Sequence, residues 1–175
     1  MAVIEAIATT YLEADAASVT FSGIPSTYEH LQLRMSLLCD RTATDNWYVY
    51  MRFNSDSGAN YSQHRMFANG GAGTTGAGNT GETAFWIPHL QTLGGAAANY
   101  GPYVIDVFDY ASTNKNTTFS CLGGSGAEST MAGLFSGLWD DTAALTTIWL
   151  APDAAASAPV WQRGSVFTLY GLNSA

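Results

Sequence analysis

The sequence predicts an all-β protein, an antiparallel β-sandwich of jelly-roll type with about nine or ten short strands in one domain, residues 1–175. Three observations favour this class. Apolar and polar residues alternate along most of the chain, which is the period of a strand. Clusters of Gly, Asn, Ser and Pro separate these stretches. No stretch combines helical periodicity with capping residues, and no linker or internal repeat divides the chain.

Three strands are expected before the first long polar loop. Val3–Leu12 and Ala17–Ile24 alternate, and Pro25 ends the second. The third is His30–Cys39, and the loop Asp40–Asn46 follows it. One face of this third strand is apolar and carries Leu31, Leu33, Met35, Leu37 and Cys39.

The block Trp47–Phe67 is typical of a β-hairpin. Two aromatic-rich alternating arms, Trp47–Phe53 and Tyr61–Ala68, flank Asn54–Asn60, which consists of turn formers. Oxygen donors at alternate positions of this turn also resemble a calcium loop. The later acidic ligand that completes such a site is missing, and a turn explains the same residues, so no metal is assigned.

The middle of the chain is rich in small residues. Asn69–Gly81 is predicted to be an exposed loop, because it holds too much glycine for a paired strand. Glu82–Leu93 contains Pro88 and is expected to form an edge strand or an irregular segment. Another loop is expected at Gly94–Asn99.

The second half returns to strands. Tyr103–Tyr110 is the strongest interior strand, and Thr117–Leu122 follows it. Met131–Trp139 is ambiguous because glycines interrupt its apolar residues. Leu145–Ala151 is stopped by a proline, and Gly164–Leu172 is the last strand expected.

The composition points to a subunit that packs against others. Charged residues make up 11% of the chain, against about 25% in an average protein, and hydrophobic residues 47%. A polar but uncharged surface tolerates close contact without the desolvation of ions, so we expect a homo-oligomer. The net charge is −8 and Lys115 is the one lysine, which argues against nucleic acid and anionic membranes as partners.

Cysteine usage and the N-terminus indicate an origin in the cytoplasm. Cys39 and Cys121 lie in apolar alternating stretches, so buried free thiols are expected, with a disulfide left open. Met1–Glu5 does not begin a secretory signal, and no run of about 18 apolar residues occurs.

The sequence contains no convincing catalytic or cofactor motif. Its histidines (His30, His64 and His89) are not at metal-ligand spacings, and neither Cys-x-x-Cys nor Gly-x-Ser-x-Gly occurs. The Gly-rich segment lacks the Gly-Lys-Ser/Thr ending of a phosphate loop. Asp106 and Asp109 would face opposite sides of one strand, and Asp140 and Asp141 look like turn residues, so neither pair makes a good glycosidase site. We expect no enzyme, no cofactor and no metal.

Aromatic residues supply the remaining candidates. They can stack on sugar rings, as in lectins, but core and interface packing explains them more simply. The residues taken as a candidate interaction surface are Trp86, Trp139, Trp161 and Tyr100.

Three segments resemble a widespread group of tailed-bacteriophage virion proteins. They are the opening Ile7–Thr10 with Ala17–Pro25, the segment Arg52–Ser62, and the closing Gly164–Leu172. The likeness spans most of the chain but departs from the group between Gly70 and Gly101, where attachment or receptor contacts would lie.

The resemblance implies a β-sandwich component of a phage particle: a capsid decoration (cement) protein, a head fibre or a tail-fibre domain. The chain contains no coiled-coil or shaft segment. We therefore expect a decoration protein located in the virion, a trimer that binds the major capsid protein. The alternative is a fibre adhesin that binds a host-surface glycan.

Overall fold

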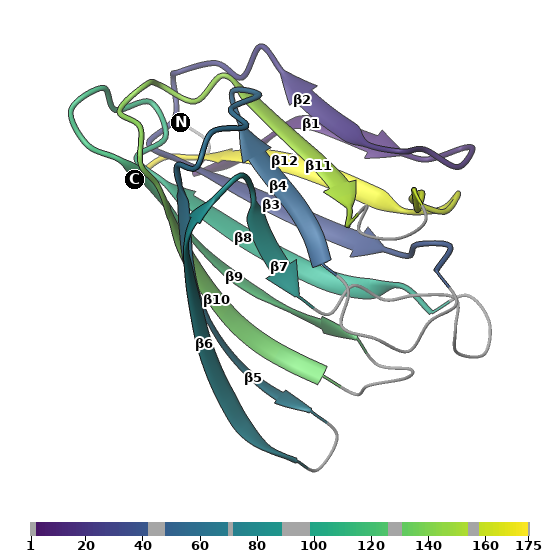
Figure 1. Ribbon diagram of the computed structural model, residues 1–175. Helices are drawn as coiled ribbons and strands as arrows, with labels where there is room; N and C mark the ends of the chain where they lie inside the picture. The colour runs from purple at the N-terminus through teal and green to yellow at the C-terminus, as the bar shows by residue number, and fades with distance from the viewer. Residues whose placement is uncertain are drawn as a thin grey trace.

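The computed structural model describes residues 3–41, 48–69, 72–88, 99–125, 131–153 and 158–174. Within these residues the protein is all-β: twelve strands form two antiparallel sheets that pack as a sandwich, as the sequence predicted (Figure 1). Across the same residues, no helix is long and apolar enough to cross a membrane.

The larger sheet has eight strands in the order β1-β12-β3-β8-β9-β10-β5-β6. Chain neighbours lie side by side at β8-β9-β10 and β5-β6, whereas β12 is inserted between β1 and β3. The bounds of these strands are β1 Ile4–Tyr11, β3 His30–Leu37, β5 Tyr61–Asn69, β6 Ala72–Glu82, β8 Gly101–Phe108, β9 Thr117–Ser125, β10 Met131–Trp139 and β12 Val166–Leu172.

The smaller sheet has four strands in the order β2-β11-β4-β7 and covers one face of the larger sheet (Figure 1). Its strands are β2 Val19–Ser22, β4 Tyr48–Phe53, β7 Phe85–Pro88 and β11 Thr147–Pro152. The edge position expected for the segment containing Pro88 is confirmed, since β7 pairs only with β4.

The core lies between the two sheets and follows the alternation of the sequence. On β3 the four predicted strand residues Leu31, Leu33, Met35 and Leu37 are buried, and polar residues alternate with them. Where the sheets meet near β7, aromatic rings pack edge to face, with Phe85 central among Phe53, Tyr61 and Phe119. Each large side chain removed from water here contributes about 1.5–3 kcal/mol to stability.

The expected hairpin over Trp47–Phe67 is wrong. β4 pairs with β11 and β7 in the smaller sheet, whereas β5 pairs with β10 and β6 in the larger one. Asn54–Asn60 therefore carries the chain from one sheet to the other. Asn54 and Ser55 have positive φ angles of 49° and 58°. These left-handed conformations suit Asn more than most residues, and they direct the chain out of the smaller sheet.

The loop predicted over Asn69–Gly81 is also corrected. Residues 72–82 form β6, an edge strand of the larger sheet that pairs with β5. Regular pairing runs from Thr75 to Asn79, and the register shifts on either side of it. Backbone pairing needs no side chain, so hydrogen bonds to β5 offset the conformational cost of the glycines.

Glycines also explain the segments that the sequence left ambiguous. A Cβ on Gly137 in β10 would meet the rings of Phe119 and Phe85. A Cβ on Gly123 in β9 would meet the ring of Tyr103, its cross-strand partner. Aromatic rings occupy the space that these glycines leave, so both strands continue through them.

Both cysteines are free and buried, as expected from their apolar surroundings. Burial raises the pKa of Cys39 to about 11 and raises that of Cys121 as well.

Candidate interaction surface

The outer face of the eight-stranded sheet, which points away from the smaller sheet, carries a row of apolar side chains. Val104 on β8 is opposite Leu122 on β9, which is opposite Leu134 on β10, which is opposite Met66 on β5. Their exposed fractions are 37%, 61%, 52% and 53%. We call these four residues the apolar row.

The apolar row follows from strands that are apolar on both faces. In β8, β9 and β10 one apolar residue enters the core and its neighbour points outward, as in Ile105 and Val104 or Phe135 and Leu134. In β5, Phe67 next to Met66 is half-buried. An antiparallel sheet with one face in water normally places polar residues there. Adjacent large apolar side chains on such a face are typical of a surface that contacts another molecule.

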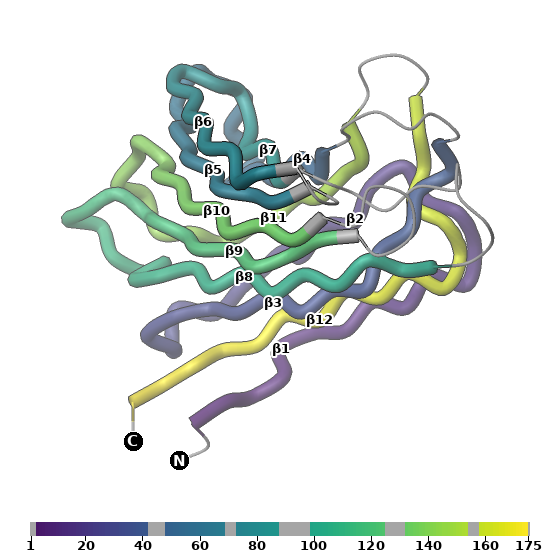
Figure 2. The backbone as a smooth tube through the Cα atoms, turned by 90° about the horizontal axis from the view of Figure 1, so that it is seen from below, coloured from purple at the N-terminus to yellow at the C-terminus, as the bar shows by residue number. Residues whose placement is uncertain are grey.

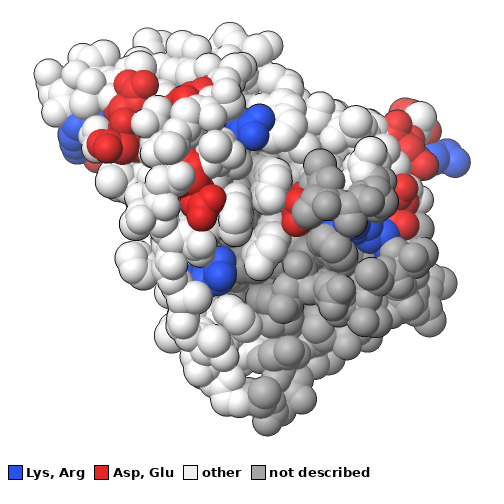
Figure 3. Space-filling view, in the orientation of Figure 1, with Lys and Arg blue, Asp and Glu red and all other residues white. Residues whose placement is uncertain are grey.

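Charge on this face is low and internally balanced. Arg34 on β3 is opposite Val104, donates to the Gln32 side chain at 2.7 Å, and places its guanidinium 5.0 Å from the Tyr170 ring centroid. Gln32 in turn donates to Asp106 at 2.7 Å. The side chain of Gln32 therefore connects the two charged groups, Arg34 and Asp106. On the other side of the molecule, where the smaller sheet is in front in Figure 3, charged residues are scattered, and Lys and Arg form no continuous patch among the described residues.

A shallow depression of about 570 Å³ lies beside the apolar row. Its outward-facing lining combines hydroxyl and imidazole groups with apolar side chains: Ser62, His64, Phe108, Thr118, Ser120, Ser136 and Leu138. Ser120 is opposite Ser136, and Ser136 is opposite His64. This arrangement offers hydroxyl donors and acceptors to a ligand or to a partner surface.

The four residues expected at an interaction surface do not come together. Trp139 and Trp161 are 1% and 0% exposed, so that expectation is corrected for both of them: they are core residues. Tyr100 is half-buried, and its hydroxyl donates to the Arg163 carbonyl at 2.7 Å. Trp86 is half-buried on the outer face of the smaller sheet, with ring centroids 5.6 Å from Tyr48 and 6.0 Å from Tyr50.

The carboxylate of the calcium-like loop is engaged by the protein itself. Asp56 accepts hydrogen bonds from the Trp139 indole at 2.8 Å, the Asn60 amide at 2.9 Å and the Gly58 backbone at 2.7 Å. Burial raises its pKa, but these hydrogen bonds outweigh burial and the net pKa is lowered. Among the described residues, no group of three or more His, Cys, Asp or Glu side chains is placed to hold a metal ion.

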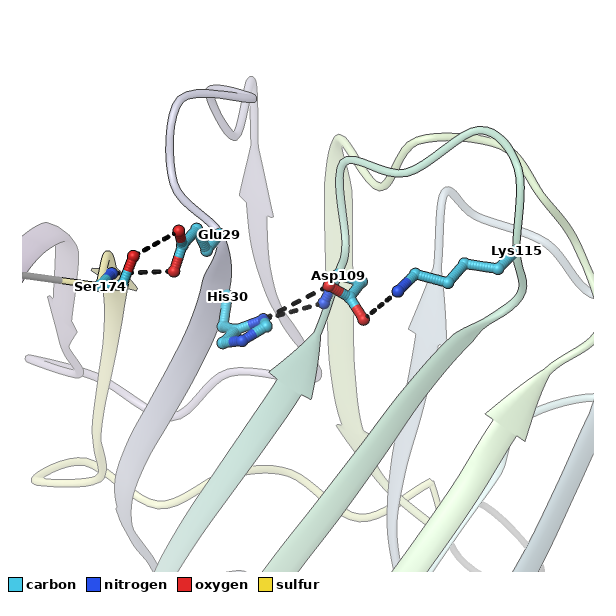
Figure 4. A network of polar contacts seen from close by, with 5 residues as sticks. All are labelled: Glu29, His30, Asp109, Lys115 and Ser174. Atoms are coloured by element: carbon cyan, nitrogen blue, oxygen red, sulfur yellow. Dashed lines mark hydrogen bonds and ion pairs between the residues drawn. The ribbon is translucent and has the colours of Figure 1, made fainter.

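The polar contacts of His30, Asp109 and Glu29 connect the ends of strands (Figure 4). The Nδ1 atom of His30 accepts a hydrogen bond from the Asp109 backbone at 3.0 Å, and Lys115 pairs with the Asp109 carboxylate at 2.6 Å. The bond from Lys115 lowers the pKa of Asp109. Glu29 accepts two bonds from Ser174, which lower the pKa of Glu29. His89 lies outside the described residues.

Sequence reasoning missed the apolar row, although a signal for it exists. Each of its four strands contains two consecutive large apolar residues, which places one of them on the solvent side: Met66-Phe67, Val104-Ile105, Cys121-Leu122 and Leu134-Phe135. The alignment of these pairs across four strands is set by the register, which the sequence does not reveal.

No family model matches the chain, and no curated protein matches it. Among solved structures, the chain is similar to an alginate lyase that was solved in complex with an alginate tetrasaccharide. The identity is 8%, the match covers 89% of this chain and 79% of that chain, and the TM-score is 0.27. A superposition this poor carries no activity or substrate over to this protein.

Proposed function

We propose that this protein is a non-enzymatic structural subunit of a tailed-bacteriophage particle, namely a capsid decoration protein that assembles as a homotrimer and stabilises the shell. The apolar row carries the proposal. It exposes large apolar side chains on a sheet face where the two ions balance each other, in a chain with 11% charged residues. The resemblance of three segments to phage virion proteins supports the same setting.

The mechanism is passive. A partner surface that covers Leu122, Leu134 and Met66 removes their side chains from water, and each square ångström of apolar area buried contributes about 25 cal/mol. Subunits that bind the assembled shell and not its dissociated parts stabilise it by mass action.

The decisive experiment is reconstitution of phage particles that lack this protein. Adding back the wild-type chain should raise the temperature at which the particles release DNA. Leu122→Lys should fail to do so, because it places a charge in the apolar row. Thr20→Lys, at an exposed position of β2 in the smaller sheet and away from both the apolar row and the depression, is the charge-matched control. An unchanged release temperature with wild-type protein would rule out the cement role.

A second function, glycan binding by a fibre domain, is favoured by one observation. The Tyr50 and Trp86 rings lie 22° from coplanar on the outer face of the smaller sheet, and aromatic faces of this kind stack on sugars. A glycan array with the purified chain and with Trp86→Ala tests this function, and a blank array with the wild type would exclude it. Copy number also separates the roles, since a decoration protein is present in hundreds of copies per particle and a fibre in a few to tens.

A further inference from the structure

The two sheets have four edge strands, and three of them are short or irregular. β2 and β7 have four residues each, and β7 ends at Pro88. β1 is interrupted by a register shift between Ala6 and Ala8. Such features protect edges from pairing with another chain. β6 is the longest of the four, with eleven residues, and among the described strands it pairs on one side only, with β5. Its register shifts lie on either side of a regular central stretch, Thr75–Asn79.

β6 also lacks the side chains that block an edge. No charged residue or proline occurs from Ala72 to Gly81, although the whole chain has a net charge of −8. Two copies of β6 can therefore approach each other without the like-charge repulsion that other parts of the surface would cause. The regular stretch Thr75–Asn79 presents backbone N–H and C=O groups on the side away from β5.

Two glycines of β6 are not required by any contact among the described residues. A Cβ on Gly73 would meet nothing within 4 Å, and a Cβ on Gly76 would meet only the Arg65 carbonyl oxygen, at 3.8 Å. Neither residue has the positive φ that requires glycine. Gly78 contrasts with them, because a Cβ there would meet the His64 ring at 2.7 Å. Glycine within a strand is typical of sites where another backbone approaches closely.

We propose that β6 pairs antiparallel with β6 of a second copy of this chain, so that the eight-stranded sheets of two subunits become one continuous sheet. The backbone edge selects an extended strand as its partner, because only another strand matches its row of donors and acceptors. An antiparallel pair of identical strands is self-complementary about a two-fold axis. The lack of charge from Ala72 to Gly81 favours a second copy over an oppositely charged partner.

The contact would extend the candidate interaction surface. Met66, the last member of the apolar row, is opposite Gly76 on β6. Residues opposite each other in an antiparallel pair point to the same side of the sheet. Pairing of the two β6 strands would therefore place the apolar rows of both copies on one side of the joined sheet. This inference goes beyond the proposed function and does not depend on it. A two-fold contact cannot close a trimer, so in combination with the proposed three-fold contact it would join two trimers into a hexamer.

Cysteine cross-linking tests the pairing directly. Single cysteines are placed in turn at Thr74, Thr75, Gly76 and Ala77, and the wild type, with both thiols buried, is the background control. A residue near the two-fold axis faces its own copy, so at least one of these variants should form a disulfide-linked dimer under mild oxidation. Ser136→Cys, on the central strand β10, should not. Cross-linking at Ser136 alone would overturn the proposal by placing the contact on the sheet face.

Sedimentation provides the second measurement. The wild type should dimerise, and Gly76→Lys should weaken the dimer at least tenfold while leaving circular dichroism unchanged, because the added side chain has open space in the monomer. Thr20→Lys, at an exposed position of β2 in the smaller sheet, is the charge-matched control and should leave the dimer intact. A wild type that stays monomeric at about 100 μM, or a dimer unaffected by Gly76→Lys, would refute the β6 contact. Leu122→Lys should fail to raise the DNA-release temperature of the particles but should leave the β6 dimer intact. The two experiments therefore test the two proposals separately.

Discussion

At the scale of single residues, Asp56 shows how a polar loop is fixed between two sheets. Its carboxylate accepts from Trp139, Asn60 and Gly58, and the hydroxyl of Tyr61 donates to the Asp56 carbonyl at 2.9 Å. Trp139 is a core residue, so its indole N–H depends on this one carboxylate. Leaving a buried donor without its partner destabilises the folded protein by about 1–3 kcal/mol.

We expect Asp56→Asn to lower the free energy of unfolding by roughly 1–3 kcal/mol at neutral pH, because the amide group cannot accept all three bonds. The folded-state pKa of Asp56 lies below its ordinary value of 3.8, so the carboxylate stabilises the fold above that pH. This stabilisation is lost as the pH falls through the folded-state pKa. The difference in unfolding free energy between wild type and Asp56→Asn, measured by urea unfolding, should therefore become smaller below about pH 4.

Trp139→Phe provides the control for this prediction. It removes the indole donor and retains an aromatic ring, so Asp56→Asn should cost less in the Trp139→Phe background than in the wild type. If Asp56→Asn lowers the unfolding free energy equally in both backgrounds, the indole hydrogen bond does not contribute. If the difference between wild type and Asp56→Asn does not change with pH, the charge of Asp56 has no role.

At the scale of elements, the alternation of the sequence predicts which face of a strand is buried, but not which sheet the strand joins. β4 and β5 each alternate clearly, so both strands were predictable, yet their partners lie in different sheets. Asn54 determines this separation: its side-chain oxygen accepts from the Thr146 and Thr147 backbones at 2.8 and 3.1 Å, which anchors the end of β4 to β11. Contacts between residues so distant in sequence leave no local signal.

Glycines within strands have opposite roles in β10 and β6, and substitution should separate them. We expect Gly137→Ala to destabilise the protein by about 1–3 kcal/mol, since its Cβ would overlap the Phe119 ring and lie 2.7 Å from that of Phe85. Gly76→Ala should be neutral or stabilise by up to about 1 kcal/mol, because its Cβ has space and the unfolded chain loses freedom. Urea unfolding at one low protein concentration measures the unfolding free energy of both variants. Equal changes for Gly137→Ala and Gly76→Ala would contradict these roles.

At the scale of the whole molecule, both thiols lie in one continuous core. Cys39 follows β3 and Cys121 lies in β9. Burial raises the pKa of Tyr103, and the nearby thiols of Cys121 and Cys39 raise it further. Exposure of either thiol requires the two sheets to separate there.

We expect the native protein to react with a thiol reagent such as DTNB only as fast as it unfolds. The single-cysteine variants Cys39→Ala and Cys121→Ala should then react at the same rate, once corrected for their unfolding free energies, because the chain opens as a unit. A remaining thiol at Cys121 that reacts much faster than one at Cys39 would show that β9, β10, β5 and β6 open separately, which would contradict a single cooperative domain.

Less of the candidate surface than of the fold could be predicted from the sequence. The buried face of β3 follows from the alternation of its sequence, because solvent and core select opposite residue types. The apolar row requires knowledge of the register across four strands, and the edge position of β6 requires the complete strand order. Aromatic content was a poor guide, since Trp139 and Trp161 serve the core.

The pairing of the first and last strands brings the chain ends together. Ile4 is opposite Leu172, the Asn173 backbone donates to the Val3 carbonyl at 3.0 Å, and both termini lie side by side in Figures 1 and 2. A short peptide can therefore bridge the two ends, so the protein is suited to circular permutation with new ends in the exposed turn at Asn114 and Lys115. A guest sequence fused at either end would also leave the sandwich from the same place.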